Sequence, residues 1–325
     1  MRFLKSEAGA IMLWLAASLI TAALLMPWLY DAGKILAHNA ATTHYPSIIE
    51  YVATSAGRAK PDRFFSRALL ISALALVPAL IRRVKRIPKK TGADRFALHK
   101  LTWPQRLTHL ASGLLTGSLC LGALAIVLDM TGAAVPKQVS LSAGRFFSSA
   151  FLPALGAGVV EELVFRGLLL GLWLRACSLR TACIGSALMF SFMHFLSPPA
   201  GMEIANPHSW HAGFEILGST IGHFTNPAFF VTEFATLTLL GLLLAYCRIR
   251  TFSLWLSIGI HAGLVFALKT FSMTRSLDPQ SPLHPWLIGS DLKSGILPLV
   301  ALGICFAACI AITHLLARNI TLSSR

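Results

Sequence analysis

Long apolar runs recur along this chain of 325 residues and constrain its fold more than any other feature. Most of them are about 18–25 residues long, which is enough for a helix to cross the ~30 Å hydrocarbon layer of a bilayer. Because backbone polar groups in lipid must be satisfied internally, helices are the expected spanning form. We therefore predict an all-α, polytopic membrane protein with about eight transmembrane helices. The predicted spans are Gly9–Tyr30, Phe65–Ile81, Leu107–Leu128, Phe146–Leu174, Thr181–Leu196, Ala228–Tyr246, Ser253–Leu268 and Ile296–Leu316.

The distribution of charge argues against a nucleic-acid partner, although the net charge is +15. Only 13% of the residues are charged, against about 25% in soluble domains. Nine basic residues lie between Arg82 and Arg106, whereas the segment Ser197–Asn226 has none. This asymmetry is the positive-inside pattern and predicts both termini in the cytoplasm, in a bacterial inner (plasma) membrane. The basic segment either contacts anionic lipid headgroups or only fixes the topology.

The first apolar run has a signal peptide as its alternative interpretation, because Arg2 and Lys5 precede it. The run Gly9–Tyr30 is longer than the usual apolar region of a signal peptide, and no small-residue cleavage site follows it. We therefore interpret it as a retained helix.

The six cysteines lie in or at the ends of predicted spans, so no disulfide framework is expected. Cys305 and Cys309 are four residues apart on one helix face, and this spacing favours helix packing over a metal pair.

Two adjacent carboxylates and an arginine interrupt the fourth apolar run, in Glu161-Glu162-Leu163-Val164-Phe165-Arg166-Gly167. Ionisable residues at bilayer depth indicate a functional site by default. Glu162 and Arg166 are four residues apart, so on a helix they share one face and form an ion pair. Glu161 points about 100° away from that face. Glu161 is therefore the expected working carboxylate, with its pKa raised by the apolar site and the neighbouring acid.

Two histidines lie in other predicted spans. His194 ends the sequence Phe190-Ser191-Phe192-Met193-His194, and His261 lies in Ile260-His261-Ala262-Gly263. A single intramembrane histidine is often only a hydrogen-bonded packing residue. Two histidines and two glutamates on three spans are more readily explained by a shared polar cavity than by separate packing roles. We therefore predict that the helices surround such a cavity.

Together these motifs resemble the CAAX protease and bacteriocin-processing family, the Abi-type glutamic intramembrane proteases related to type II CAAX prenyl endopeptidases. The resemblance rests on Glu-Glu-x-x-x-Arg at 161–166, Phe-x-x-x-His ending at His194, and the later helix with His261. It covers roughly Ser148 to Phe266. We divide the chain accordingly into amino-terminal helices with the basic segment (1–140), a protease-like core (141–270) and an outer loop with the last helix (271–325).

The resemblance implies an intramembrane endopeptidase that cuts a membrane-anchored peptide or protein. Glu161 would activate water as general base with help from His194, and His261 would help to stabilise the oxyanion. Glu162 and Arg166 would support the site. Glutamate and histidine would also suit zinc, but the family's glutamic mechanism needs no metal, so no cofactor is expected.

One position departs from the family pattern. The family often has Asn four residues after the last histidine, where this chain has Val265. The oxyanion partner is then missing or comes from elsewhere: Ser257 and Lys269 lie on neighbouring turns, and Thr236 or Thr238 lies on another helix. Loss of one such donor typically lowers the rate about 10²–10³-fold.

Two other functions stay open from the sequence. The first is a non-catalytic immunity or scaffold protein of the same fold, which Val265 favours. The second is a proton-coupled transporter, which would more often show inverted repeats and broken helices. His208 and His211 in the segment Ser197–Asn226 also suggest a metal site, although this segment fits better a cap over the cavity or a solvated loop.

Overall fold

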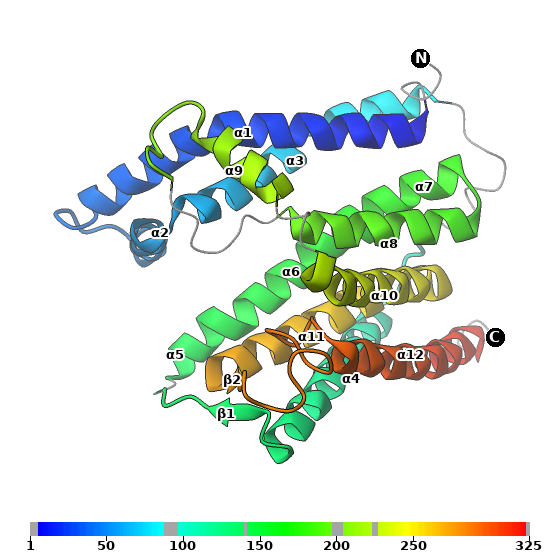
Figure 1. Cartoon of the computed structure of the whole chain (residues 1–325). Helices are drawn as coiled ribbons and strands as arrows, with labels where there is room; N and C mark the ends of the chain where they lie inside the picture. The colour runs from blue at the N-terminus through cyan, green and yellow to red at the C-terminus, as the bar shows by residue number, and fades with distance from the viewer. Residues whose placement is uncertain (1–5, 88–96, 140–141, 197–203, 223–226, 323–325) are drawn as a thin grey trace. The chain divides into compact units, whose positions relative to one another are not determined.

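The structure is a computed structural model that describes residues 6–87, 97–139, 142–196, 204–222 and 227–322. It consists of two compact units (Figure 1). The first unit comprises residues 1–88 and 192–227, and the second comprises residues 89–191 and 228–325. The amino-terminal helices of the predicted segment 1–140 are therefore shared: three belong to the first unit and one to the second.

In the described residues, the first unit contains four complete helices and the end of α8. The four helices are α1 (Glu7–Asn39), α2 (Ser47–Arg58), α3 (Pro61–Lys85) and α9 (Ala212–Gly222). α1 packs along α3 and also contacts α2 and α9. The core contains the buried side chains of Met26, Phe64, Phe65 and Ile216. These large apolar groups pack against one another where the helices meet, and van der Waals packing of this kind drives the association of membrane helices.

The segment predicted as an outer loop or cap between Ser197 and Asn226 contains a helix. α9 buries Ala212, Ile216 and Thr220, and its apolar residues pack in the core of the first unit. Residues 197–203 and 223–226, with Glu203 and His223, lie outside the described residues. The sequence prediction missed α9 because a helix of 11 residues is shorter than a membrane span.

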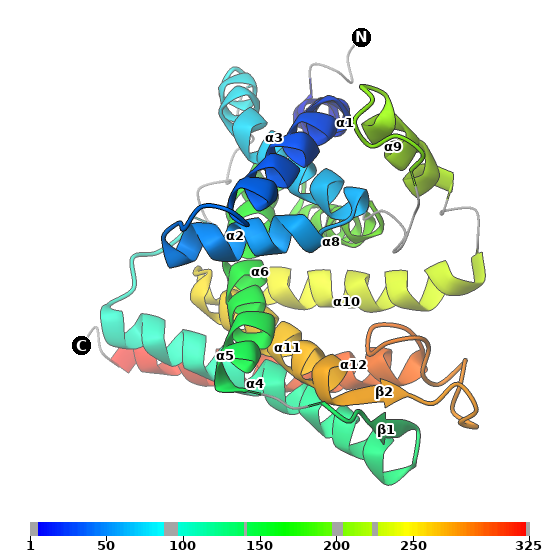
Figure 2. The same cartoon turned by 90° about the vertical axis from the view of Figure 1, so that its left-hand side faces the viewer.

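The second unit contains the remaining elements. They are α4 (Trp103–Met130), β1 (Ala134–Pro136), α5 (Ala143–Phe146), the π-helix η3 (Phe147–Phe151), α6 (Leu152–Glu162), the π-helix η4 (Leu163–Leu169), α7 (Leu170–Ala176), α8 (Leu179–Phe195), α10 (Pro227–Thr251), α11 (Trp255–Thr274), β2 (Arg275–Leu277) and α12 (Ile296–Leu322). The last residues of α8, from Phe192, belong to the first unit. α11 contacts both α4 and α6, and α12 packs on α4 (Figure 2).

The predicted helical membrane fold is confirmed. Six described helices are long and apolar enough to cross a membrane: 9–39, 61–85, 103–130, 231–251, 255–274 and 296–316. Of the two other predicted spans, Phe146–Leu174 is divided between α-helical and π-helical segments, and Thr181–Leu196 corresponds to α8, which has 17 residues. The six apolar helices make the chain an integral membrane protein.

Four glycines bring the backbones of α4 and α11 into close contact. A Cβ atom added at Gly113 or Gly117 on α4 would lie 2.5 or 2.4 Å from a backbone oxygen of α11. A Cβ at Gly259 or Gly263 on α11 would lie 2.3 Å from a backbone oxygen of α4. Small residues four apart allow this approach between membrane helices. Each helix therefore fits against the other only because both carry a Gly-x-x-x-Gly pair.

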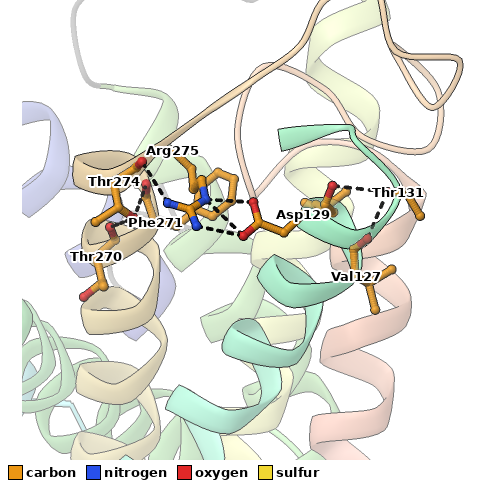
Figure 3. A network of polar contacts seen from close by, with 8 residues as sticks. Val127, Asp129, Thr131, Thr270, Phe271, Thr274 and Arg275 are labelled. Atoms are coloured by element: carbon orange, nitrogen blue, oxygen red, sulfur yellow. Dashed lines mark hydrogen bonds and ion pairs between the residues drawn. The ribbon is translucent and has the colours of Figure 1, made fainter. Parts of the chain in front are cut away.

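A two-stranded clasp joins the ends of the same two helices. β1 follows α4 and pairs antiparallel with β2, which follows α11 directly. Figure 3 shows the guanidinium of Arg275 facing the Asp129 carboxylate near the end of α4, and the two groups form hydrogen bonds of 2.7 and 2.9 Å. The sequence analysis predicted an all-α chain and missed these strands, because three-residue strands are too short for an alternating pattern to reveal them.

Candidate active site

The two glutamates lie at the junction of α6 and the π-helix η4. Glu161 and Glu162 end α6, and Arg166 lies within η4. π-Helical turns are rare and occur frequently at functional sites, where they alter the direction of side chains. The charged motif therefore lies where the helix departs from regular geometry.

The predicted ion pair between Glu162 and Arg166 is present. Arg166 Nη1 lies 2.9 Å from Glu162 Oε1, and the two side chains are 1% and 0% exposed. Arg166 also donates from Nη2 to the backbone oxygen of Gly241 on α10, at 3.3 Å. Its guanidinium lies over the ring of Phe190, 4.3 Å from the centroid. Buried charges are tolerated when they are paired and hydrogen-bonded. The pair supplies the opposite charge and part of the hydrogen bonding, while Glu162 Oε2 and Arg166 Nε are buried without a hydrogen-bond partner among the described residues.

His261 lies between the two glutamates. Its Nδ1 is 3.0 Å from Glu162 Oε1, and its Nε2 is 3.8 Å from Glu161 Oε2. A carboxylate ionised by its pairing with Arg166 can only accept, so Nδ1 carries a proton and donates it to Glu162. The same carboxylate oxygen thus binds both the arginine and the histidine and fixes the orientation of the imidazole.

The two carboxylates differ in accessibility. The Glu161 side chain is 32% exposed, whereas Glu162 is completely buried. The accessible part of Glu161 does not include Oε2, the oxygen that faces His261, because that atom is itself buried. The two acids therefore differ in their surroundings: Glu161 is partly exposed, whereas Glu162 is buried against Arg166 and His261.

The comparison with protein families gives one match. Residues 143–267 match the family described as type II CAAX prenyl endopeptidase, Rce1-like. This part of the chain is similar to the Rce1-like family. The match confirms the resemblance predicted from the sequence and includes both glutamates, Arg166 and His261. Neither the curated proteins nor the solved structures that were compared with the chain gave a match.

His194 is the fifth residue in the motifs on which the resemblance rests. It lies near the end of α8 and is partly buried. Because His194 belongs to the first unit and the glutamates to the second, its participation stays a prediction.

The alternative oxyanion donors on α10 lie in the second unit with the glutamates. Thr236 donates to the backbone oxygen of Thr232 at 2.8 Å, so its hydroxyl hydrogen is engaged within the helix. The buried Thr238 hydroxyl has no hydrogen-bond partner among the described residues. On α11, Lys269 is exposed and Val265 is partly buried. Of these side chains, Thr238 is the one whose hydroxyl hydrogen remains available.

The sequence analysis assigned no role to two residues that contact the site, Phe190 and Gly241. Phe190 contacts the His261 ring edge to face at 5.9 Å and lies beneath Arg166. Gly241 supplies a backbone oxygen to Arg166. Ser257, one of the oxyanion partners considered from the sequence, donates its hydroxyl hydrogen to the backbone oxygen of Leu254 at 3.0 Å. Phe190 occurs in the quoted Phe-x-x-x-His motif, so the sequence carried a signal for it. Gly241 carried none, because any residue presents a backbone oxygen.

The histidines of the segment 204–222 have carboxylate partners. His208 contacts Asp31, and His211 Nε2 lies 3.1 Å from Glu215 Oε1. Within the described parts of the chain, no group of three or more His, Cys, Asp and Glu side chains is arranged to hold a metal ion. Among the described residues, His208 and His211 therefore do not form part of a metal-binding group of three.

Proposed function

We propose that the protein is a glutamic intramembrane endopeptidase that hydrolyses a peptide bond of a membrane-associated protein or peptide. The observation that carries this proposal is the contrast between two adjacent acids. Glu161 is partly exposed and lies 3.8 Å from His261 Nε2, while Glu162 is buried between Arg166 and His261 Nδ1. Activation of water requires a general base that the water can approach, which is the role proposed for Glu161. Glu162 is buried and is proposed only to hold its neighbours in place.

In the proposed reaction, Glu161 takes a proton from water as the water oxygen attacks the scissile carbonyl carbon. The π electron pair of the carbonyl moves to its oxygen and forms the oxyanion. When the tetrahedral intermediate collapses, the C=O bond re-forms and the C–N bond breaks. Glu161 then gives its proton to the leaving nitrogen, so the carboxylate is regenerated.

His261 is proposed to stabilise the oxyanion. Its Nδ1–H is engaged with Glu162 at 3.0 Å, so only Nε2 can face the reaction. When the ring carries both protons, Nε2–H can donate to the developing charge. Glu162, held by Arg166, keeps this imidazole in one orientation. Glu162 and Arg166 are thus positioning residues, and His194 is proposed to assist Glu161 with the water.

The experiment is cleavage of membrane-anchored peptides by the purified full chain in lipid nanodiscs. The panel contains prenylated CAAX-type tails, unmodified tails, leader peptides and C-terminal sorting tails. Glu161→Gln removes the base and should abolish turnover, whereas His261→Ala should lower kcat about 10²–10³-fold. Cleavage unaffected by a chelator supports the glutamic mechanism, and cleavage abolished by it contradicts this mechanism.

The matched control is Glu233→Gln. Glu233 also lies in a helix of the second unit, but its carboxylate pairs with Lys293 at 2.7 Å and not with Arg166 or His261. This variant should cleave like the wild type. His194→Ala tests the proposed assistance, and its kcat should fall with little change in KM.

The second candidate is a non-catalytic immunity or scaffold protein of the same fold, favoured by Val265 in place of the family's Asn. It predicts no cleavage of any panel member and no effect of Glu161→Gln in the cell. In both cases we propose that the chain lies in a bacterial inner membrane with cytoplasmic termini. Accessibility labelling of single cysteines at the two ends tests that orientation.

A further inference from the structure

The short helix α2 has an apolar stripe that the protein leaves uncovered. Ile48, Tyr51 and Val52 form this stripe and are 80%, 60% and 49% exposed. They lie three or four residues apart, so they share one side of the helix. On another side, Ala53 and Ala56 are buried, and Ala56 belongs to the core of the first unit. Single exposed apolar residues are common, whereas a contiguous group of large ones marks a contact surface.

α2 joins two helices that are long and apolar enough to cross a membrane, 9–39 in α1 and 61–85 in α3. Figure 1 shows α1 along its length and α2 nearly end on, whereas Figure 2 shows α2 along its length. α2 therefore runs across α1 and not along it. A helix that connects two spans and lies across them runs along the surface of the membrane.

The contacts between α2 and α1 fall just beyond the uncharged run that ends at Tyr30. A Cβ atom added at Gly33 would lie 3.4 Å from the Cβ of Ala56, and one added at Gly57 would lie 3.2 Å from the Cβ of Ala37. With a rise of ~1.5 Å per residue, Gly33 and Ala37 lie about 5 and 10 Å beyond Tyr30. The headgroup layer on each side of the hydrocarbon is about 5–8 Å thick, so α2 lies at headgroup depth.

The same contacts show which side of α2 faces the bilayer. Gly57 contacts α1 one turn farther from the uncharged run than Ala56 does, so turning around α2 from Gly57 to Ala56 leads toward the hydrocarbon. Val52 follows about 40° later in the same sense, and Ile48 about 40° after it. Thr54 is exposed and lies about 160° from Val52. The apolar stripe therefore faces the membrane, and Thr54 faces away from it.

Basic side chains border the apolar stripe. Arg67 of α3 donates from Nη2 to the hydroxyl of Ser55 on α2 at 3.4 Å, and its guanidinium lies 5.7 Å from the centroid of the Phe64 ring. Ser55 lies on the same side of α2 as the apolar stripe. Exposed basic residues at the end of α2 and the start of α3 are Arg58, Lys60 and Arg63. This surface is complementary to a layer of lipid phosphates with acyl chains beneath it.

We propose that α2 is an interfacial helix that inserts its apolar stripe into the phospholipid headgroup layer of the membrane that the chain crosses. Arg67 and the neighbouring basic residues then contact lipid phosphates. Amphipathic helices of this kind bury their apolar face about 5–10 Å into the boundary between headgroups and acyl chains. Tyr51 fits this position, because tyrosine is enriched where a membrane protein meets the headgroups. The occupant is the protein's own bilayer, because the spans on both sides of α2 hold it at this depth.

The test is fluorescence of an NBD label on the full chain in nanodiscs of phosphatidylethanolamine and phosphatidylglycerol. Val52→Cys places the label on the apolar stripe, and the matched control Thr54→Cys places it on the opposite side of α2. Both side chains are exposed in the protein itself, so a difference between the labels reports what surrounds the protein. The label at position 52 should be quenched by lipid that carries a nitroxide near the top of its acyl chain. Aqueous iodide should quench it severalfold less than the label at position 54.

Two further arms complete the test. Ile48→Cys should behave like Val52→Cys, and the unsubstituted chain, labelled in parallel, gives the background from the native cysteines. Equal quenching of the labels at positions 52 and 54 would overturn the proposal, because the two sides of α2 would then have the same surroundings. A label at position 52 that is protected from both iodide and the lipid nitroxide would show that another protein surface covers the stripe, and would overturn the lipid assignment.

Discussion

The substitution Gly263→Ala tests how closely the helix that carries His261 is held against α4. The new Cβ would lie 2.3 Å from the backbone oxygen of Leu114, and real Cβ contacts essentially never fall below 3.0 Å. The two backbones must therefore separate by about 0.7 Å. No flexible side chain can absorb this shift, because the opposing atom belongs to the backbone. Overpacking of this kind typically costs about 1–3 kcal/mol.

The same substitution would also affect the candidate active site, because it pushes α11 away from α4. α11 contacts α6 on another side, where a Cβ at Gly158 would already lie 2.9 Å from the Cβ of Ala262. Moving α11 away from α4 thus disturbs the position of His261 relative to α6, the helix that carries both glutamates. Catalytic groups tolerate only about 0.5 Å of displacement. A shift near 1 Å can lower the rate about 10²-fold.

The assay combines denaturant unfolding in mixed micelles with peptide cleavage. Gly263→Ala should lose about 1–3 kcal/mol of unfolding free energy and up to about 10² in kcat/KM. Gly122→Ala is the matched control, since a Cβ at Gly122 on α4 meets nothing within 4 Å. It should be neutral or stabilise the protein by up to ~1 kcal/mol through helix propensity. If Gly263→Ala were as stable and active as the wild type, the close backbone contact would be refuted.

Two further predictions concern charged groups. Glu162→Gln should lower the unfolding free energy by about 3–5 kcal/mol, because it leaves the buried Arg166 without its carboxylate, and the double variant Glu162→Leu/Arg166→Met should recover most of that loss in the same denaturant assay. Burial alone would lower the pKa of Lys293, but the carboxylates of Asp291 and Glu233 outweigh it, so the pKa lies above its usual 10.5. The resulting stabilisation is complete below pH 10.5 and is lost as the pH rises through the raised pKa. The gap in melting temperature between wild type and Lys293→Met should thus stay constant near neutral pH and narrow only in strong alkali.

Local spacing determined which parts of the site could be predicted. The pairing of Glu162 with Arg166 follows from four residues along one helix, and it is present at 2.9 Å. The hydrogen bond from His261 to Glu162 joins residues 99 positions apart, and no local pattern contains it. The sequence could therefore assign residue types to a site, but not the contact that orients the imidazole.

The missed elements have a common physical cause. α9, β1 and β2 are short, and their formation depends on tertiary partners rather than on a long periodic pattern. The glycine contact is different, because Gly113-x-x-x-Gly117 and Gly259-x-x-x-Gly263 are both readable in the chain. The sequence analysis drew no prediction from this spacing, and the spacing alone does not say which helices meet.

The contact between α4 and α11 also limits how the chain can be divided. The segment that matches the family, residues 143–267, includes Gly259 and Gly263 but neither α4 nor β2. Expressed alone, it would present to lipid a glycine-lined helix face shaped to another backbone, and it would lack the clasp of β1 and β2 at the far end of the pair. The boundaries of sequence similarity are thus not the boundaries of an autonomous folding unit. A minimal protein built around Glu161 has to begin before Trp103 and extend past Leu277.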